Sequence, residues 1–128
     1  MTVVKVVDAS AVVALLFGEP EGEGVARRLA GARLAVPRLL DFELANVCLR
    51  KCKRHPEKRD AILTAFRLRD RLDVEQVAVD CEEVLALAME TGLTAYDASY
   101  LYLARNLAAE LVTLDQKLDR AGAALPNP

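Results

Sequence analysis

Short strand-forming segments alternate with longer helix-forming segments along almost the whole of this sequence. Apolar and β-branched runs at residues 3–7, 34–36, 74–79 and 111–113 predict four strands. A helix that connects two such strands makes a right-handed crossover, so the strands lie parallel and helices cover both faces of the sheet. The alternation therefore predicts an α/β fold built on one parallel sheet.

The helical segments are marked by residues that begin or end helices. Pro37 is expected to open one helix, Asp80 begins a capping box, and Gly92 is placed to end the helix that follows it. The helices are predicted at residues 9–17, 21–31, 37–54, 57–72, 80–91, 94–109 and 115–121. No repeat, linker or low-complexity segment divides them. Residues 1–128 are therefore expected to form a single domain.

The composition fits one soluble domain in a reducing compartment. The chain has 128 residues, of which 53% are hydrophobic. The longest uninterrupted apolar stretch, residues 11–17, is far shorter than the roughly 20 residues that span a bilayer. Three cysteines cannot form an even disulfide framework, which predicts a cytoplasmic location. The net charge of −2 gives no global reason to bind nucleic acid, so any such binding must be local.

Four acidic side chains stand apart from the charged helix faces that carry most of the others. Asp8 lies between two apolar runs, directly after the first predicted strand, and Asp115 follows the last predicted strand. The carboxyl ends of parallel strands share one edge of the sheet. These two side chains can therefore meet in one crevice.

The other two acids are placed by a helical wheel of about 100° per residue. The helix predicted at residues 37–54 has one polar stripe, which consists of Glu43, Asn46, Arg50, Lys53 and Arg54. Asp41 points to the opposite, mostly apolar side. In the helix predicted at residues 94–109, Asp97 lies on the buried side, one turn from the start. Glu43 and Asp97 can therefore face the same sheet edge as the two strand-end acids.

Each of these acids also has a simpler explanation. Asp8 and Asp115 can cap the helices that follow them. Thr94 and Asp97 fit a capping box, and Glu43 can be a solvated helix residue. Capping does not predict that acids from four separate segments converge. Convergence predicts a bound cation, because clustered carboxylates repel one another unless they are protonated, dispersed or neutralised.

The sequence offers oxygen ligands for such a cation and few others. His55 is the only histidine and stands in a loop before a proline. Cys48 and Cys52 lie on an apolar arc, which is typical of small buried hydrophobes rather than of a zinc pair. An all-oxygen site selects Mg²⁺ or Mn²⁺. These ions bind phosphate oxygens and activate water, so the sequence predicts a phosphodiesterase or nuclease.

Positive charge for neighbouring phosphates is available on the helix that carries Glu43. The basic run of residues 50–54 lies two to three turns beyond Glu43, and it includes Arg50, Lys53 and Arg54 of the polar stripe. A run of charge is also typical of a solvated helix face. Aromatic residues make up 5% of the chain and none is tryptophan, so strong sequence readout by base stacking is not expected.

Four short motifs span almost the whole chain. They are Val-Val-Asp8-Ala-Ser10, Glu43-Leu-Ala-Asn46, Leu-Thr-Ala-Tyr-Asp97-Ala and Val-Thr113-Leu-Asp115. In their order and spacing they resemble the PIN domain, and specifically the small VapC toxin ribonucleases of bacterial and archaeal toxin-antitoxin pairs. The resemblance implies an acidic quartet that binds one or two Mg²⁺ or Mn²⁺ ions and is catalytic, formed by Asp8, Glu43, Asp97 and Asp115. It further implies that Ser10 and Thr113 help to order the site.

The resemblance also implies an activity, partners and a sheet. The expected protein is an endoribonuclease that hydrolyses RNA phosphodiester bonds and forms a homodimer. Its inhibitor would be a cognate VapB-like antitoxin whose C-terminal segment lies over the active site and the helices beside it. The family has about five parallel strands, whereas residues 123–128 form a short end that closes with prolines. Four or five strands are therefore expected.

Two other functions fit parts of the same pattern. A phospho-receiver signalling domain is also a doubly wound fold with clustered acids and Mg²⁺. It needs adjacent acids after its first strand and a lysine after its last, whereas here Asp8 is solitary and the last strand leads to Asp115. A PIN-like domain kept only for binding partners is the other possibility. The intact acids at all four positions argue against it.

Overall fold

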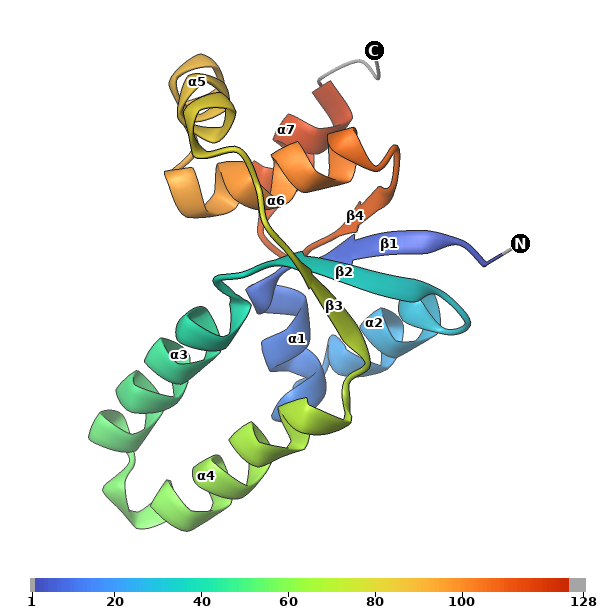
Figure 1. Cartoon of the computed structure of the whole chain (residues 1–128). Coiled ribbons are helices and arrows are strands. Elements are labelled where there is room, and N and C mark those ends of the chain that lie inside the picture. The colour runs from blue at the N-terminus through green and yellow to red at the C-terminus, as the bar shows by residue number, and fades with distance from the viewer. Residues whose placement is uncertain (1, 125–128) are drawn as a thin grey trace.

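A parallel sheet of four strands forms the centre of the fold in residues 2–124, the part of the chain that this computed structural model describes (Figure 1). The strands are β1 Val4–Val7, β2 Arg33–Pro37, β3 Val74–Val77 and β4 Glu110–Val112. Their order across the sheet is β3-β2-β1-β4, and each neighbouring pair is parallel. The predicted α/β fold with one parallel sheet is therefore confirmed.

Helices cover both sides of this sheet. In Figure 1, α1 to α4 lie on one side of the sheet and α5 to α7 lie on the other. The α-helices are α1 Ala9–Leu16, α2 Gly22–Leu29, α3 Leu40–Arg54, α4 Arg59–Arg67, α5 Cys81–Thr91, α6 Ala95–Asn106 and α7 Gln116–Ala124. Two 3-10 helices, η1 Pro56–Lys58 and η2 Leu68–Arg71, flank α4. Asp80 caps α5, and Gly92 ends it in the left-handed conformation with φ of 75°, as the sequence predicted.

The direction in which the chain moves across the sheet reverses after β3. The strands β1, β2 and β3 are laid side by side, and the chain then crosses back to place β4 on the other side of β1. β4 pairs with β1 through Val7 and Val112, while α1 and α7, which follow these two strands, lie on opposite sides of the sheet (Figure 1). A crevice forms beyond the carboxyl ends of two such strands, and it is the usual ligand site of this type of sheet.

The strands are most deeply buried at the same carboxyl ends. Val7, Val36 and Val112 are completely buried, and Leu40 of α3 and Tyr100 of α6 close the core around them. A close-packed apolar frame of this kind leaves little freedom to the residues that directly follow the strands. The frame therefore fixes where the strand-end side chains lie.

Several predicted helix ends differ from the structure by two or three residues: α2 ends at Leu29 rather than at residue 31, α6 at Asn106 rather than at 109, and α7 at Ala124 rather than at 121. Two further differences concern how a segment folds. Pro37 ends β2, where it pairs with Val77, and α3 begins at Leu40. The prediction that Pro37 opens this helix is wrong, because the fixed φ of proline also suits an extended strand end, where its missing N–H is tolerated. The single helix predicted at residues 57–72 is divided into η1, α4 and η2, because both ends tighten into 3-10 turns.

The expectation of a fifth strand concerns the end of the chain. The last helix, α7, continues to Ala124, so the first part of the segment in question is helical. Residues 125–128 lie outside the described residues. Within residues 2–124, no helix is both long enough and apolar enough to cross a membrane.

Candidate functional site

Asp8 stands directly after β1 and is buried, with 4% of its surface exposed. Its carboxylate caps α1 by accepting from the backbone N–H of Ala11 at 3.1 Å. It also accepts from the hydroxyls of Ser10 at 2.7 Å and Thr113 at 2.6 Å, so that each of its oxygens has a donor. Asp8 is thus a helix cap, as one explanation predicted, and its orientation at the sheet edge is fixed as well.

The two hydroxyls also connect the loops that follow β1 and β4. Ser10 Oγ accepts from the backbone N–H of Leu114 at 2.9 Å, and it lies 3.4 Å from Thr113 Oγ1. Thr113 Oγ1 accepts from the backbone N–H of Asp115 at 3.0 Å. The carboxylate of Asp115 in turn caps α7 by accepting from Leu118 at 2.9 Å. A continuous hydrogen-bond chain therefore holds Asp8 and Asp115 at one edge of the sheet.

The two helix acids lie across the crevice from these loops. Asp97 is in the first turn of α6, where its backbone N–H donates to the capping hydroxyl of Thr94 at 3.1 Å. Tyr100, one turn further along α6, donates its hydroxyl to Glu43 Oε1 of α3 at 2.7 Å. Tyr100 is buried, with 1% of its surface exposed. This hydrogen bond links α6 to α3 and orients the Glu43 carboxylate.

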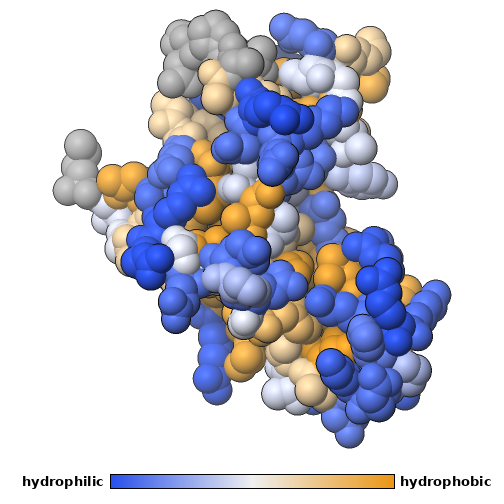
Figure 2. Space-filling view, turned by 180° about the vertical axis from the view of Figure 1, so that it is seen from behind, coloured by the Kyte–Doolittle hydropathy of each residue, from blue (hydrophilic) through white to orange (hydrophobic). Residues whose placement is uncertain are grey.

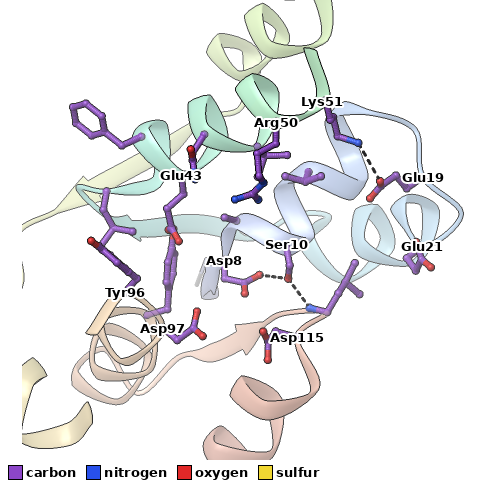
Figure 3. A pocket seen from close by; sticks show the side chains of 18 residues that line it. Asp8, Ser10, Glu19, Glu21, Glu43, Arg50, Lys51, Tyr96, Asp97 and Asp115 are labelled. Carbon is purple, nitrogen blue, oxygen red and sulfur yellow. Dashed lines mark hydrogen bonds and ion pairs between the residues drawn. The ribbon is translucent and has the colours of Figure 1, made fainter. Parts of the chain in front are cut away.

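All four acids line one pocket of about 940 Å³ (Figure 3). The predicted site residues in its wall are Asp8, Ser10, Glu43, Asn46, Arg50, Asp97 and Asp115. Thr113 is not part of the wall, but it supports the wall through its bond to Asp8. The convergence expected from strand ends and helix faces is therefore present in the structure.

Lys53 and Arg54 belong to the predicted polar stripe of α3, but they do not line this pocket. Arg54 points in nearly the same direction as Glu43 but stands 11 residues further along α3, or roughly 16 Å at the rise of a helix. Lys53 lines a different pocket, between α3 and α4. Lys51, rather than Lys53, lines the pocket that holds the four acids, because the loop between α1 and α2 closes this pocket on the Lys51 side of α3.

The end of the pocket away from the four acids is lined by two cationic side chains, Arg50 and Lys51, together with Glu19 and Glu21 (Figure 3). Arg50 lines it and is exposed, and among the described residues it makes no ion pair. Lys51 Nζ lies 3.8 Å from Glu19 Oε2 and 4.7 Å from the centre of the Phe17 ring. Figure 3 shows the Lys51–Glu19 pair on the side of the pocket remote from Asp97 and Tyr96. The pocket thus has an acidic half and a half with two cationic side chains.

The four acids influence one another electrostatically. Burial raises the pKa of the carboxyls of Asp8, Glu43 and Asp97 above their ordinary values. Repulsion between carboxylates adds to this effect. Asp115 raises the pKa of Asp8 and Asp97, and Asp97 raises that of Glu43. Burial also raises the pKa of the Tyr100 phenol, which therefore stays protonated and remains a donor.

The chemistry of this pocket fits a hard divalent cation. Its acidic half offers oxygen ligands, and its mutually repelling carboxylates would be stabilised by positive charge. Within residues 2–124, however, no ready-made group of three or more His, Cys, Asp or Glu side chains is close enough to hold a metal ion. The carboxylates are held by hydroxyl and amide donors instead, as described above for Asp8 and Glu43. The donor type therefore fits, while the side chains are not closed into a ligand shell.

A second pocket, the α3–α4 groove, lies on the far side of α3. Its volume is about 620 Å³, and it is lined by Ala45, Cys48, Leu49, Cys52, Lys53, Pro56, Arg59, Leu63 and Phe66. Cys48 and Cys52 carry free thiols here among apolar neighbours, as expected for small hydrophobes. Viewed from behind in Figure 2, apolar side chains are exposed between charged ones over the part of the molecule that holds α3 and α4.

Several residues of the pocket wall are not among the predicted site residues, and two of them, Tyr100 and Lys51, pair with acidic side chains. Tyr100 was visible only as an apolar neighbour of Asp97 on the buried face of α6, although its spacing of three residues from Asp97 placed it on the same side. On the helical wheel, Lys51 and Lys53 lie at equal angles from Glu43 but on opposite sides of it. Only the position of the α1–α2 loop distinguishes the two lysines.

Comparison with known proteins gives consistent relationships. A family model described as PIN domain matches residues 5–124. The chain is 32% identical over 128 residues to Ribonuclease VapC3 of Pyrobaculum aerophilum, covering 96% of this chain and 98% of that protein. It is 38% identical over 125 residues to Ribonuclease VapC9 of Mycobacterium tuberculosis, covering 93% of this chain and 91% of that protein. The crystal structure of PAE2754 from Pyrobaculum aerophilum superposes with a TM-score of 0.75 at 29% identity, covering 94% of this chain and 86% of that one.

Proposed function

Because this chain belongs to the VapC-like part of the PIN-domain family, we propose that it is a metal-dependent endoribonuclease and the toxin of a VapBC-type toxin-antitoxin pair. One observation carries the proposal. Four acids from four separate segments line a single pocket beyond the carboxyl ends of the paired strands β1 and β4. They are Asp8, Glu43, Asp97 and Asp115. The relatives that match over most of their length are named ribonucleases, which supports RNA as the substrate.

The four acids would hold one or two Mg²⁺ or Mn²⁺ ions. Such an ion, when bound, supplies charge stabilisation at the phosphate and an activated water. The chain supplies rigidity around the ligands. Ser10 and Thr113 fix the rotamer of Asp8, and Tyr100 fixes that of Glu43. Asn46 stands one turn beyond Glu43 in the same wall, where its amide can donate to a phosphate oxygen.

The two cationic side chains of the pocket, Arg50 and Lys51, would bind the RNA backbone beside the cut. Arg50 stands seven residues beyond Glu43, or roughly 10 Å along the helix, which places it at a neighbouring phosphate rather than at the reacting one. Lys51 would join it by leaving Glu19. Binding of phosphates by Lys53 and Arg54 remains a prediction, and it would require RNA to extend along α3 beyond the pocket.

The toxin assignment adds partners that belong to the same proposal. A cognate VapB-like antitoxin would inhibit the enzyme by covering the active site, and its apolar residues would suit the α3–α4 groove. The protein would act as a homodimer in the cytoplasm, where its three free thiols remain reduced. Size-exclusion chromatography with light scattering tests the dimer, and a short adjacent gene for a DNA-binding protein would support the antitoxin.

The activity can be tested with linear and covalently closed circular single-stranded RNA. We expect the purified protein to cut both substrates with Mn²⁺ or Mg²⁺, since an endonuclease needs no free end, and to lose activity in EDTA. Asp97→Asn should abolish cleavage, whereas Asp60→Asn, at an exposed acid of α4 outside the pocket, should not. Cutting of linear RNA alone would identify an exonuclease. Cleavage by an Asp8→Asn, Asp97→Asn double variant would contradict the site.

The two alternative functions predict different outcomes in the same assays. A receiver domain would take up phosphate from acetyl phosphate onto an aspartate, but β4 leads to Thr113, Leu114 and Asp115 without the lysine that a receiver needs. A PIN-like binding module would cut no RNA under any metal condition while still binding its partner. Metal-dependent cleavage that depends on Asp97 excludes both alternatives.

A further inference from the structure

Two aromatic side chains of the pocket are far more exposed than the others in the chain. Phe42 is 80% exposed and Tyr96 is 64% exposed, and both line the pocket that holds the four acids. The chain has three phenylalanines and three tyrosines, and the other four aromatics are buried or partly buried. The few aromatic rings that face solvent in this protein are therefore gathered at its candidate active site.

The two rings hold equivalent positions on the two helices that frame the site. Phe42 directly precedes Glu43 in the first turn of α3, and Tyr96 directly precedes Asp97 in the first turn of α6. Neighbouring residues on a helix point about 100° apart, so each acid turns into the pocket while the ring beside it stands at the rim. Figure 3 shows Tyr96 beside Glu43 and Asp97, on the opposite side of the pocket from Lys51.

The faces of both rings are accessible. Phe17 and Phe66 are covered on one face by Lys51 and Arg69, whose cationic groups lie 4.7 and 4.0 Å from the ring centres. Among the described residues, Phe42 has no such partner and neither does Tyr96. A single exposed apolar residue is common and needs no explanation. Two exposed rings beside the acids of one pocket are a specific arrangement that contributes little to folding.

A flat apolar face beside a phosphate site suits an unpaired nucleobase. Bases of single-stranded RNA stack on aromatic side chains, whereas the bases of a duplex are already covered by their neighbours. We propose that Phe42 and Tyr96 form a stacking subsite for the two unpaired bases on either side of the cleaved phosphodiester. The inference rests on the proposed ribonuclease activity and adds the two residues that contact the bases. Arg50, exposed in the same pocket, supplies the complementary contact to the backbone.

The experiment compares intact, abasic and duplex forms of one short RNA that the protein cuts in Mn²⁺. The abasic form lacks the bases on either side of the cut. Phe42→Ala and Tyr96→Ala should each raise KM for the intact RNA about tenfold, equivalent to about 1.4 kcal/mol, with little change in kcat. Phe42→Trp and Tyr96→Phe keep a ring face and should retain wild-type KM. Met89→Ala removes another exposed apolar side chain, 75% exposed on α5 and outside the pocket, and serves as the control.

The abasic RNA provides the decisive comparison. Wild-type protein should bind it about a hundredfold more weakly than intact RNA, because both stacks are lost, whereas the double variant with Phe42→Ala and Tyr96→Ala should no longer distinguish the two RNAs. A duplex form should be cut poorly by every variant. A second readout avoids catalysis: in an Asp97→Asn background, 2-aminopurine placed beside the cut should lose fluorescence on binding, and it should keep its fluorescence with Phe42→Ala and Tyr96→Ala.

Failure of this inference can be told apart from failure of the proposed function. If wild-type protein cuts RNA in Mn²⁺ but the alanine variants keep wild-type KM, or if abasic RNA is cut as well as intact RNA, the stacking subsite is refuted and the ribonuclease stands. If the variants change only the oligomeric state in size-exclusion chromatography, the rings are protein contacts and the inference is also refuted. If the wild-type protein cuts no RNA, the proposed function itself fails.

Discussion

The hydroxyl of Tyr100 donates a 2.7 Å hydrogen bond to Oε1 of Glu43, and so joins α6 to α3 across the acidic pocket. Tyr100 is buried and belongs to the core, whereas Glu43 is only partly buried and faces the pocket. A core residue therefore determines the orientation of a residue of the site. This hydrogen bond links the two helices that carry the exposed rings and the helix acids, in addition to the core that they share.

Tyr100→Phe should reduce both stability and activity. Glu43 would lose its donor while remaining half-buried, which should lower the free energy of unfolding by about 1–3 kcal/mol and raise the Mn²⁺ concentration needed for cleavage. Tyr102→Phe is the matched control, because its hydroxyl donates to Glu83 at 2.6 Å on the surface of the molecule, away from the pocket. Urea unfolding and Mn²⁺ titration of cleavage measure the two effects. Equal results for both variants would contradict a positioning role for Tyr100.

Thr113→Val tests the support beneath Asp8. The valine keeps the shape of the side chain but removes the donor that lies 2.6 Å from Asp8 Oδ2, and Asp8 is buried. We expect a loss of about 1–3 kcal/mol in the free energy of unfolding, together with slower cleavage. Thr64→Val, which removes an exposed hydroxyl bonded to the Asp60 carbonyl, should change stability by less than about 0.5 kcal/mol.

Asp97→Asn should make the metal-free protein more stable at neutral pH. The Asp97 carboxylate is disfavoured by burial and by repulsion from Asp115 and Asp8, which raise its pKa above the ordinary 3.8. As the pH falls through the folded-state pKa, the wild-type carboxyl binds a proton and the penalty disappears. The difference in the free energy of unfolding between Asp97→Asn and the wild-type protein, measured in EDTA, should therefore be largest near pH 7 and should decrease toward zero at acidic pH.

The same pair of proteins tests the role of the metal. Added Mn²⁺ should stabilise the wild-type protein more than Asp97→Asn, because it binds the folded state through this carboxylate. Thermal unfolding at several pH values, with EDTA or Mn²⁺, measures both effects. If the difference does not decrease as the pH is lowered toward 3.8, the ordinary pKa of an aspartate, repulsion at Asp97 is not the cause.

Arg50→Ala should weaken RNA binding and its dependence on salt. Loss of one phosphate contact with single-stranded RNA should reduce the slope of log K against log salt by about 0.7. Lys53→Ala, on the same helix but lining the α3–α4 groove, should reduce the slope only if the RNA extends along α3 beyond the pocket. Fluorescence anisotropy with an Asp97→Asn background measures binding without cleavage. If both variants reduced the slope equally, the RNA would follow α3 beyond the pocket.

Two glycines of α2 should respond in opposite ways to alanine. A Cβ at Gly22 would lie 2.6 Å from the carbonyl oxygen of Ala14, so that α1 and α2 would have to separate, at a cost of about 1–3 kcal/mol. At Gly24 the nearest neighbour of a Cβ is the end of the Arg27 side chain, at 4.0 Å, so alanine should stabilise the helix by about 0.5–1 kcal/mol. Urea unfolding of the two variants tests how closely α1 and α2 are packed.

The positions of the acids could be predicted from the sequence because simple geometry decides them. Asp8 and Asp115 follow strands whose direction is set by the alternation of strands and helices, and the pairing of β1 with β4 brings them to one edge. Glu43 and Asp97 were placed by helical periodicity alone. In all four cases, a regular strand or helix determines the position of the residue's backbone, and so the place from which its side chain extends.

Features that depend on loops and on exposure could not be predicted. The wheel gives Lys51 and Lys53 equal angles from Glu43, and only the α1–α2 loop decides which of them enters the pocket. The low aromatic content argued against strong sequence readout by base stacking, but composition does not show where in the fold the aromatic rings lie. Phe42 and Tyr96 became notable only once their exposure and their shared pocket were known.

The hydrogen-bond chain through Ser10 and Thr113 joins residues 103 positions apart, and the bond from Thr113 to Asp8 spans 105. Half of the acidic quartet is therefore supplied by segments near the end of the chain, and Asp8 gains its full set of donors only when β4 pairs with β1. A chain still emerging from the ribosome has no complete site. For the proposed ribonuclease, this topology means that cleavage cannot begin until translation has passed β4.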